Sequence, residues 1–219
     1  MESELNPFRD WLAAHVSGPG VWKWDHYLDI YARYFERFRG SEVHVAECGV
    51  FGGGSLRMWR DYFGDRCTVY GIDINPHCKR YRSERIEIFI GDQGNRDFWQ
   101  RFKRSVPVLH IFIDDGSHLP DHQATTLEEI LPHLQPGGVY ICEDIHGIHN
   151  PFAGYVAALT HRLNEALPGD QPWSYRATGL QRFVKAVHQY PYLAVIERNE
   201  RPMEAFVSRR AGTEWPPES

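Results

Sequence analysis

The residues best able to do chemistry in this chain are acidic side chains that follow short apolar runs. Asp115 ends the run "VLHIFIDD", and Glu143 and Asp144 lie at the end of "VYICEDI". Carboxylate oxygens are the ligands that hard divalent cations such as Mg²⁺ prefer, and these ions keep positions open for water or substrate oxygens. A bound cation also lowers the pKa of an oxygen beside it. The three residues are therefore a predicted metal site.

A histidine lies close to these predicted ligands. His118 follows Asp115 by three residues, on the turn before a predicted helix, and His122 lies four residues farther on. Because an imidazole titrates near neutral pH, we expect His118 to take a proton as a general base. The spacing of the two histidines also leaves open a zinc site of two histidines and one aspartate.

The stretch "AECGVFGGGSLRMW" holds four glycines within six residues, between a predicted strand and a predicted helix. A P-loop would need a lysine where Ser55 stands, and a dinucleotide fingerprint would need a small residue where Arg57 stands. Glycine serves where the backbone needs positive φ or where another group must come close. We expect the backbone from Gly49 to Gly53 to approach a ligand that needs no phosphate cradle.

The elements that must position these residues follow a regular pattern. From Val43 onward, strand-like runs alternate with helical runs, which predicts an α/β fold: a doubly wound, mostly parallel sheet with helices on both faces. The segment "QPGG" is a predicted turn. Two strand-like runs broken at Tyr190-Pro191 predict a C-terminal antiparallel hairpin, and "EAFVSR" is a further candidate strand.

Ligands bind such sheets beyond the carboxyl ends of the strands. A single aspartate at a strand end is often only a helix cap. Here acidic residues end every strand of the parallel set, which indicates a polar site. The predicted site residues at these ends are Glu47, Gly49, Asp73, Asp92, Gln93, Asp114, Asp115, Glu143 and Asp144. Strand alternation sends Asp114 and Asp115 to opposite sides, so we expect Asp114 to lie near the bound cofactor.

The N-terminal part of the chain is predicted to be helical. "DHYLDIYARYFERF" places its aromatic side chains on one helical stripe, with Asp25 as the expected N-cap and Gly40 as the C-terminal stop. We expect this stripe to pack the helix onto the edge of the sheet.

A glycine turn between two acidic strand ends is the pattern of class I S-adenosylmethionine-dependent methyltransferases. The segments "AECGVFGGGSLRMWRDYFG", "YGIDINPHC", "IGDQ", "FIDDGSHLPDHQ" and "PGGVYICEDIH" resemble the metal-dependent O-methyltransferases of natural-product sugars, of the mycinamicin and macrocin type. They also resemble the cephalosporin-biosynthesis methyltransferase group. The likeness covers most of the chain, and "DDGSH" followed by "EDIH" is its most specific part.

The resemblance implies a role for each of these residues. Glu47, Gly49, Gly53 and Ser55 would surround the methionine part of S-adenosylmethionine, which the glycines allow to come close to the backbone. Asp73 would hold the ribose hydroxyls, and Asp92 with Gln93 would face the adenine. Asp115, Glu143 and Asp144 match the metal ligands of the family, with Mg²⁺ as the expected ion. His118 matches its catalytic histidine.

The composition limits the kinds of partner that the protein is expected to bind. The 219 residues carry a formal net charge of -5 with no basic stripe, so we expect no nucleic-acid partner. We expect no signal peptide and no membrane-spanning segment, and cysteines without a CxxC pair fit a cytoplasmic protein. The expected organisation is an N-terminal helical cap over 1–40, a methyltransferase domain over 41–210 and a disordered tail over 211–219. A homo-oligomer stays open.

Three functions remain in competition. The first is Mg-dependent O-methyl transfer to a hydroxyl of a sugar, a glycoside or a related small molecule, such as a glycosylated natural product in antibiotic biosynthesis. The second is a metal-dependent hydrolase that uses the Asp/His cluster, which leaves the glycine turn and Asp73 unexplained. The third is a non-catalytic S-adenosylmethionine-binding relative. The motifs leave N- or C-methylation open, and residues near Trp22–His26, Leu119–His122 and His146–Tyr155 are expected to shape the acceptor pocket.

Overall fold

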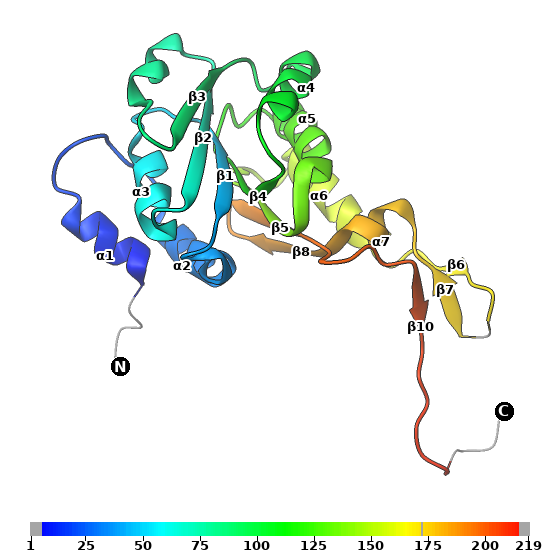
Figure 1. Cartoon of the computed structure of the whole chain (residues 1–219). Helices are drawn as coiled ribbons and strands as arrows, with labels where there is room; N and C mark the ends of the chain where they lie inside the picture. Colours follow the sequence, from blue (N-terminus) through cyan, green and yellow to red (C-terminus); the bar gives the residue numbers. More distant parts are fainter. Residues whose placement is uncertain (1–5, 172, 215–219) are drawn as a thin grey trace.

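A seven-stranded sheet forms the centre of the protein in a computed structural model that describes residues 6–171 and 173–214 (Figure 1). The strand order is β3-β2-β1-β4-β5-β9-β8. The first five strands are parallel, whereas β9 and β8 run antiparallel to their neighbours. The strands are β1 (Val43–Cys48), β2 (Cys67–Asp73), β3 (Ile86–Ile90), β4 (Leu109–Asp114), β5 (Leu134–Cys142), β8 (Val184–Tyr190) and β9 (Leu193–Arg198). The expected doubly wound sheet and its C-terminal hairpin are confirmed.

Helices cover both faces of the sheet, since the alternation along each strand sends apolar side chains to two separate cores. One core joins the helices α1 (Pro7–Ala14), α2 (Asp25–Phe35) and α3 (Gly54–Phe63) to strand residues such as Ile111 and Ile113. The other joins α4 (Arg96–Ser105), α5 (Pro120–Ile130) and α6 (Pro151–Arg162) to strand residues such as Phe112 and Tyr140. Short 3-10 turns, η1 (Glu36–Phe38), η2 (Pro76–Tyr81) and η3 (Leu131–His133), complete this part.

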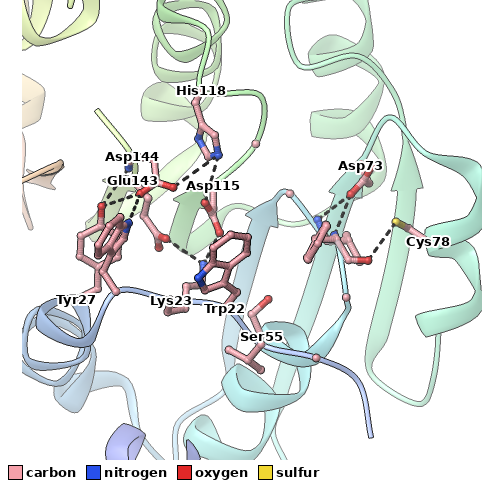
Figure 2. Close-up of a pocket in the computed structure, with 18 of the residues that line it drawn as sticks. Trp22, Lys23, Tyr27, Ser55, Asp73, Cys78, Asp115, His118, Glu143 and Asp144 are labelled. Carbon is pink, nitrogen blue, oxygen red and sulfur yellow. Dashed lines mark hydrogen bonds and ion pairs between the residues drawn. The ribbon is translucent and has the colours of Figure 1, made fainter. Parts of the chain in front are cut away.

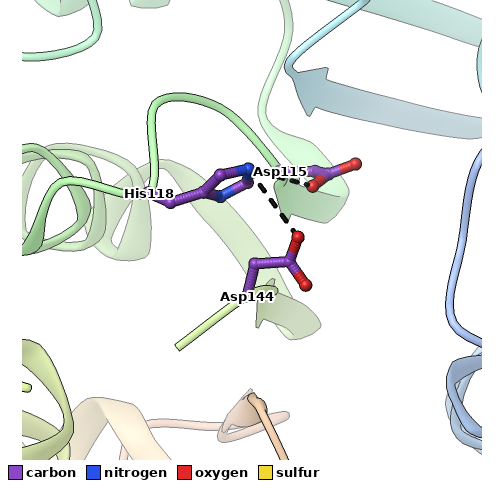
Figure 3. Close-up of side chains that lie close together, drawn as sticks. All are labelled: Asp115, His118 and Asp144. Atoms are coloured by element: carbon purple, nitrogen blue, oxygen red, sulfur yellow. Dashed lines mark ion pairs between the residues drawn. The ribbon is translucent and has the colours of Figure 1, made fainter. Parts of the chain in front are cut away.

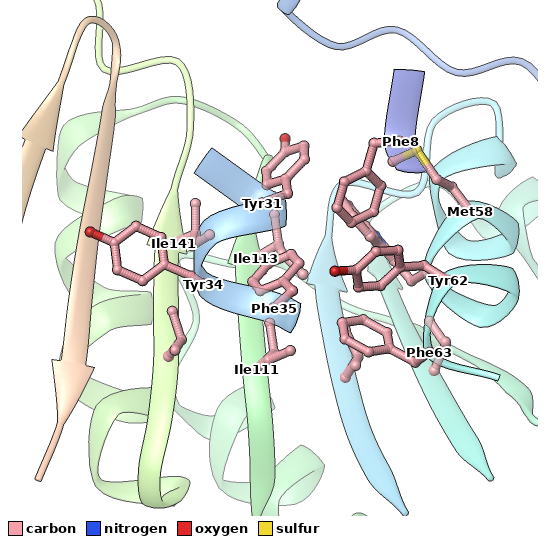
Figure 4. Packing of buried hydrophobic residues seen from close by; sticks show 14 of the residues in the cluster. Phe8, Tyr31, Tyr34, Phe35, Met58, Tyr62, Phe63, Ile111, Ile113 and Ile141 are labelled. Atoms are coloured by element: carbon pink, nitrogen blue, oxygen red, sulfur yellow. The ribbon is translucent and has the colours of Figure 1, made fainter. Parts of the chain in front are cut away.

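The aromatic helix α2 packs on the face of the sheet, and the prediction of an edge position is wrong. Its buried stripe includes Tyr31 and Phe35, which lie against Ile111, Ile113 and Ile141 of the central strands (Figure 4). A stripe this wide buries more apolar area against a face than an edge strand offers. Helix α1 closes the same core, where the rings of Phe8 and Tyr62 stack with their centroids 4.1 Å apart.

The ends of α2 also differ in part from the expectation. Trp24 is the N-cap and offers no side-chain cap, whereas Asp25 is the first helical residue and binds Arg9 at 3.0 Å. Gly40, with a φ of 68°, follows η1 and ends the helical segment as expected.

Two C-terminal features also change the expected layout. The predicted "QPGG" turn lies within β5, where the pairing with β4 shifts register. The candidate strand in "EAFVSR" forms β10 (Ala205–Val207), but it pairs in a separate sheet with β7 (Ser174–Arg176), which also pairs with β6 (Leu167–Pro168). This small sheet stands away from the main sheet, beyond α7 (Gly179–Phe183) (Figure 1). Much of the predicted tail, 215–219, lies outside the described residues.

None of the helices in residues 6–171 and 173–214 has the length and apolar character needed to cross a membrane.

Candidate active site

A cavity of about 800 Å³ opens where the parallel strands reach their carboxyl ends (Figure 2). The turns after β1, β2, β4 and β5 form its floor, as the topology of such sheets requires. A segment that precedes α2, residues 18–24, crosses one side of the cavity, and we call it the N-terminal strap. Residues that line the cavity include Trp22, Lys23, Gly49, Ser55, Asp73, Cys78, Asp115, His118, Glu143 and Asp144.

The glycine turn after β1 is held by other parts of the protein. Gly49 has a φ of 95°, and a Cβ there would lie 1.8 Å from the carbonyl oxygen of Asp115. A Cβ at Gly53 would meet the ring of Tyr81 at 2.5 Å. These close contacts require residues without a side chain.

The other two glycines of the turn face the strap. A Cβ at Gly52 would lie 2.7 Å from the carbonyl oxygen of Gly20, and one at Gly54 would lie 2.4 Å from that of Pro19. The Gly54 N–H also donates to the Gly20 carbonyl at 3.1 Å. On these sides the groups that approach the glycines belong to this chain, while Gly49 and Gly52 also line the cavity.

Asp73, at the end of β2, organises the same turn. Its Oδ2 accepts hydrogen bonds from the backbone N–H groups of Val50 and Phe51 at 2.9 and 3.1 Å, and its Oδ1 accepts one from Asn75 at 2.8 Å (Figure 2). A carboxylate oxygen has two lone pairs, so Asp73 keeps acceptor capacity toward the cavity that it lines. This arrangement agrees with the predicted place of Asp73.

The least expected member of the site is Lys23 of the strap, whose ammonium group lies among three carboxylates. Its Nζ lies 3.0 Å from Glu47 Oε1, 2.7 Å from Asp115 Oδ2 and 3.0 Å from Glu143 Oε2. The Lys23 side chain is 2% exposed, and those of Glu47 and Glu143 are 0% and 1% exposed. Buried charges persist where they are paired and hydrogen-bonded, as these are.

Burial and pairing act in opposite directions on these groups. Burial opposes the charged form of Lys23, but the attraction of Asp115, Glu143 and Glu47 outweighs it and raises the pKa of Lys23 well above its usual value. Burial raises the pKa of both Glu47 and Glu143, while the charge of Lys23 opposes that change. The charge of Lys23 is therefore the largest influence that opposes protonation of these two carboxyl groups.

A second group of side chains lies on the more open side of Asp115. One ligand atom each from Asp115, His118 and Asp144 lies within 4.8 Å of the other two (Figure 3). His118 Nε2 is 3.9 Å from Asp115 Oδ1 and 3.7 Å from Asp144 Oδ2. These side chains are 20–39% exposed and face the cavity. The two carboxylates offer oxygen ligands for a divalent cation with open coordination positions, and the imidazole lies beside them.

The backbone and the strap hold this open group in place. His118 and Asp144 have φ values of 58° and 55°, a left-handed conformation that turns each side chain out of its preceding strand or loop. Asp144 Oδ1 accepts hydrogen bonds from Trp24 Nε1 and from Tyr27 OH, both at 3.0 Å. Tyr27 also accepts from the Asp144 N–H at 3.2 Å.

Glu143 is the predicted metal ligand that the structure keeps apart from this group. Tyr31 OH donates to Glu143 Oε1 at 2.5 Å, and Lys23 occupies Oε2. His122 is also apart, since its Nδ1 shares a hydrogen bond with Ser117 Oγ at 3.0 Å. The alternative zinc site with two histidines therefore has no support in the geometry.

Several predicted cofactor contacts do not line the cavity. Asp114 and Gln93 are buried and bind each other, and Asp114 also accepts from Tyr140 OH at 2.9 Å. Burial raises the pKa of Asp114 to about 7. Asp114 and Asp115 do point to opposite faces, but Asp114 enters the core, which corrects its expected place near the cofactor. Asp92 is exposed and accepts from the Gly94 N–H at 2.8 Å, as turn-forming aspartates do.

Glu47 and Ser55 form one unit beneath the cavity. Glu47 Oε2 accepts from Ser55 Oγ at 2.6 Å and from Trp59 Nε1 at 3.1 Å. Glu47 is fully buried, so it acts through Lys23 and Ser55, while Ser55 itself lines the cavity. From the sequence, Lys23 is predicted only as part of the pocket-shaping segment Trp22–His26, and Tyr31 only as part of the buried aromatic stripe.

Comparison with known proteins adds a family and a set of relatives. Residues 46–145 match the family described as "Methyltransferase domain". Demethylmacrocin O-methyltransferase of Streptomyces fradiae is 34% identical over 191 residues, which are 77% of this chain and 47% of the relative. Mycinamicin VI 2''-O-methyltransferase of Micromonospora griseorubida is 39% identical over 132 residues, which are 57% of this chain and 32% of the relative.

A solved methyltransferase structure is also similar to this chain. The MycE methyltransferase of the mycinamycin biosynthetic pathway, in complex with Mg and SAH, superposes with a TM-score of 0.74 at 28% identity. The match covers 88% of this chain and 54% of that one. The chain thus spans about half the length of the relatives that it matches.

Proposed function

We propose a function for this chain, whose residues 46–145 match the methyltransferase-domain family: it transfers a methyl group from S-adenosylmethionine to a hydroxyl of a sugar, a glycoside or a related small molecule. We propose that it does so with a divalent cation, Mg²⁺ by preference. The observation that carries the proposal is the group Asp115, His118 and Asp144, which faces the same cavity as the glycine turn and Asp73. A hydrolase would need the first group and would leave the second without a role.

The cavity fits the cofactor on one side and the cation on the other. Asp73 would accept hydrogen bonds from the ribose hydroxyls, and Gly49 and Ser55 line the wall between Asp73 and Asp115. Asp92 remains a proposed contact to the adenine, whereas Gln93 is engaged by Asp114. Asp115 and Asp144 would hold the ion, and Glu143, which also lines the cavity, remains the proposed third ligand.

In the proposed mechanism, His118 takes the proton of the acceptor hydroxyl at Nε2, the atom that faces both aspartates. When bound, S-adenosylmethionine supplies an electrophilic methyl group, and the cation makes a nearby hydroxyl more acidic. Trp24 and Tyr27 keep the Asp144 carboxylate oriented through their hydrogen bonds. Trp22, 85% exposed, and Trp24 stand at the wall of the cavity and would pack against an apolar part of the acceptor. We therefore propose a glycosylated natural product as the acceptor class, as in the relatives.

The cofactor site is tested by calorimetric titration of S-adenosylhomocysteine. Asp73→Asn keeps an oxygen for the backbone N–H groups but loses the charge, and we expect its affinity to fall about 10-fold or more, the size of a lost charge-assisted hydrogen bond. Asp65→Asn, at an exposed position after α3, is the matched control and should bind like the wild type. Equal affinity in all three proteins would contradict the role of Asp73.

The cation is tested in a methyl-transfer assay with mycinamicin VI and simple methyl glycosides as acceptors. Chelation should abolish transfer while the circular dichroism spectrum stays unchanged, and added Mg²⁺ or Mn²⁺ should restore transfer, because the proposed ligands lie beyond the ends of β4 and β5. Full transfer in excess chelator would exclude the metal mechanism. Binding of S-adenosylhomocysteine without transfer to any acceptor, with or without metal, would favour the non-catalytic alternative.

A further inference from the structure

The turn between β4 and α5 carries two residues of the proposed site, Asp115 and His118 (Figure 3). His118 has a φ of 58°, a conformation that costs free energy in a residue with a side chain. Such a conformation persists where the surrounding structure fixes it. Contacts from other parts of the protein must therefore hold this turn in place.

One of these contacts comes from Gln93, whose side-chain amide is buried beside the turn. Its Oε1 accepts a hydrogen bond from the Ser117 N–H at 2.8 Å, and its Nε2 donates to Asp114 Oδ1. The amide thus joins the end of β4 to the residue that precedes His118. Gln93 is 5% exposed, so a polar group left unpaired here would be costly.

Gly116 makes room for this amide. A Cβ at Gly116 would lie 2.3 Å from Gln93 Oε1 and 2.9 Å from Cys48 Sγ. The φ of Gly116 lies outside the left-handed region, so the close approach of these side chains is the reason for a glycine at this position. The turn is therefore shaped to receive the Gln93 amide.

Gln93 is itself held by two other elements. Trp99 Nε1, on α4, donates to the Gln93 carbonyl at 2.8 Å. Tyr140 OH, on β5, donates to Asp114 Oδ2 at 2.9 Å, so both carboxylate oxygens of Asp114 have a donor. Gln93 follows β3, which β2 and β1 separate from β4 in the sheet. These hydrogen bonds thus fix the turn relative to distant parts of the fold.

We infer that Gln93 is a positioning residue for methyl transfer: its side-chain amide sets the conformation of the turn that carries Asp115 and His118. This inference rests on the proposed function for what the turn does, and it adds to it a residue that does not line the cavity. A displacement of about 1 Å at a reacting group can cost about 100-fold in rate. Loss of the amide should therefore lower turnover from a distance.

The test begins with Gln93→Met, which keeps the length of the side chain and loses both hydrogen bonds. Amide hydrogen exchange followed by NMR should show the Ser117 N–H exchanging about 10-fold or more faster than in the wild type. With S-adenosylmethionine and mycinamicin VI, kcat should fall about 10-fold or more, while KM for S-adenosylmethionine stays within about 3-fold. Gln189→Met, at an exposed position on β8, is the matched control and should behave like the wild type.

A double variant separates hydrogen bonding from packing. Gln93→Glu with Asp114→Asn exchanges the amide and the carboxylate between the two positions. The glutamate can accept from the Ser117 N–H and from the asparagine amide, whose oxygen can accept from Tyr140 OH. Every bond then has a donor and an acceptor, so we expect exchange at Ser117 and kcat within a few-fold of the wild type.

Gly116→Ala keeps the test decisive if Gln93→Met alone does not fold. Its Cβ would displace the Gln93 amide from the other side, so exchange at Ser117 should rise as it does in Gln93→Met. Wild-type exchange at Ser117 in either variant would overturn the inference. So would a double variant as impaired as Gln93→Met, because the exchanged hydrogen bonds would then not hold the turn.

Hydrogen exchange needs no cofactor, cation or acceptor, so its outcome is distinct from that of the proposed function. Faster exchange confined to residues 115–118, in a protein whose wild type transfers no methyl group, would contradict the proposed function and still support Gln93 as the residue that holds the turn. An equal rise throughout the sheet would overturn the inference, since Gln93 would then serve general stability. Wild-type kcat beside faster exchange at Ser117 would also overturn it.

Discussion

Strands β1 and β4 lie side by side and carry polar side chains at both ends, but the two ends have different fates. At the amino ends, the His44 N–H donates to His110 Nδ1 at 3.0 Å, and His44 Nδ1 shares a hydrogen bond with Tyr70 OH at 2.9 Å. At the carboxyl ends, Glu47 and Asp115 both bind Lys23 beside a cavity. At the amino ends the polar groups bind one another, whereas at the carboxyl ends they lie beside a space large enough for a ligand.

The difference lies in what surrounds the polar groups. The two histidines are about half-buried, and burial lowers the pKa of both, so they are held neutral in the structure. At the other end, a lysine from another segment lies among the acidic groups, and their attraction raises the pKa of that lysine. Helices α3 and α5 begin at this end, and helix N-termini favour negative charge nearby. In this sheet, polar strand residues therefore indicate a ligand site only at the carboxyl ends, where the segments that connect the strands leave the sheet.

The contrast between the two ends is tested most strongly by changing a histidine at each end. His118→Ala and His118→Asn should both lower kcat by about 100-fold or more, the usual size of a lost general base. Asparagine adopts the left-handed conformation of residue 118 readily, so this variant should keep its stability while it cannot take the proton. The measurement is kcat across pH with the free energy of unfolding of the same preparations.

The matched control for His118 is His44→Gln at the amino end, which should change kcat little. Higher pH should partly restore the His118 variants, because the acceptor then loses its proton more readily. A His118→Asn enzyme within a few-fold of wild-type kcat would show that His118 only supports its turn.

Two glycines that flank β1 give the second test. Gly49→Ala, at the carboxyl end, would bring a Cβ onto the Asp115 carbonyl and force an alanine into positive φ, so we expect a loss of about 3 kcal/mol or more in the free energy of unfolding. Gly40→Ala, at the amino end, also has positive φ but has open space around it, and it should cost about 1 kcal/mol. Denaturant unfolding of both variants measures the difference, and equal losses would contradict the close approach of the Asp115 backbone.

The smallest expected effect is the acid sensitivity of the amino end. The pKa values of His44 and His110 are lower in the folded protein than in the unfolded chain, so folding favours their neutral forms. Their contribution to stability is complete above about pH 6.5, the unfolded value, and is lost as the pH falls below it. We expect less than about 1 kcal/mol, since both rings are partly exposed.

The variant His110→Asn checks this effect, because its side-chain oxygen can still accept from the His44 N–H. The difference in unfolding free energy between pH 7.5 and pH 5.5, measured in urea, should be smaller in the variant than in the wild type. An identical difference in both proteins would mean that the pair at the amino end does not contribute.

The sequence alone was sufficient to predict the sheet and to place the site at the carboxyl ends of its parallel strands. The period of apolar residues is a local property of each strand and helix, and parallel strands place their carboxyl ends together whatever their side chains. For that reason the sequence alone assigns Asp73, Asp115, His118 and Asp144 to one place, and all four line the cavity. Alternation along β4 also indicates correctly that Asp114 and Asp115 point to opposite faces.

Only the tertiary structure decided which of these groups remain available to a ligand. Asp114 and Gln93 bind each other in the core. Glu143 accepts hydrogen bonds from Tyr31 and Lys23. The strap contacts glycines that were expected to face the cofactor. The physical reason is that a local pattern sets the direction of a side chain relative to its own strand. It does not contain the partner, because Lys23 is separated from Glu143 by 120 positions in the chain and meets it only when α2 packs on the face of the sheet.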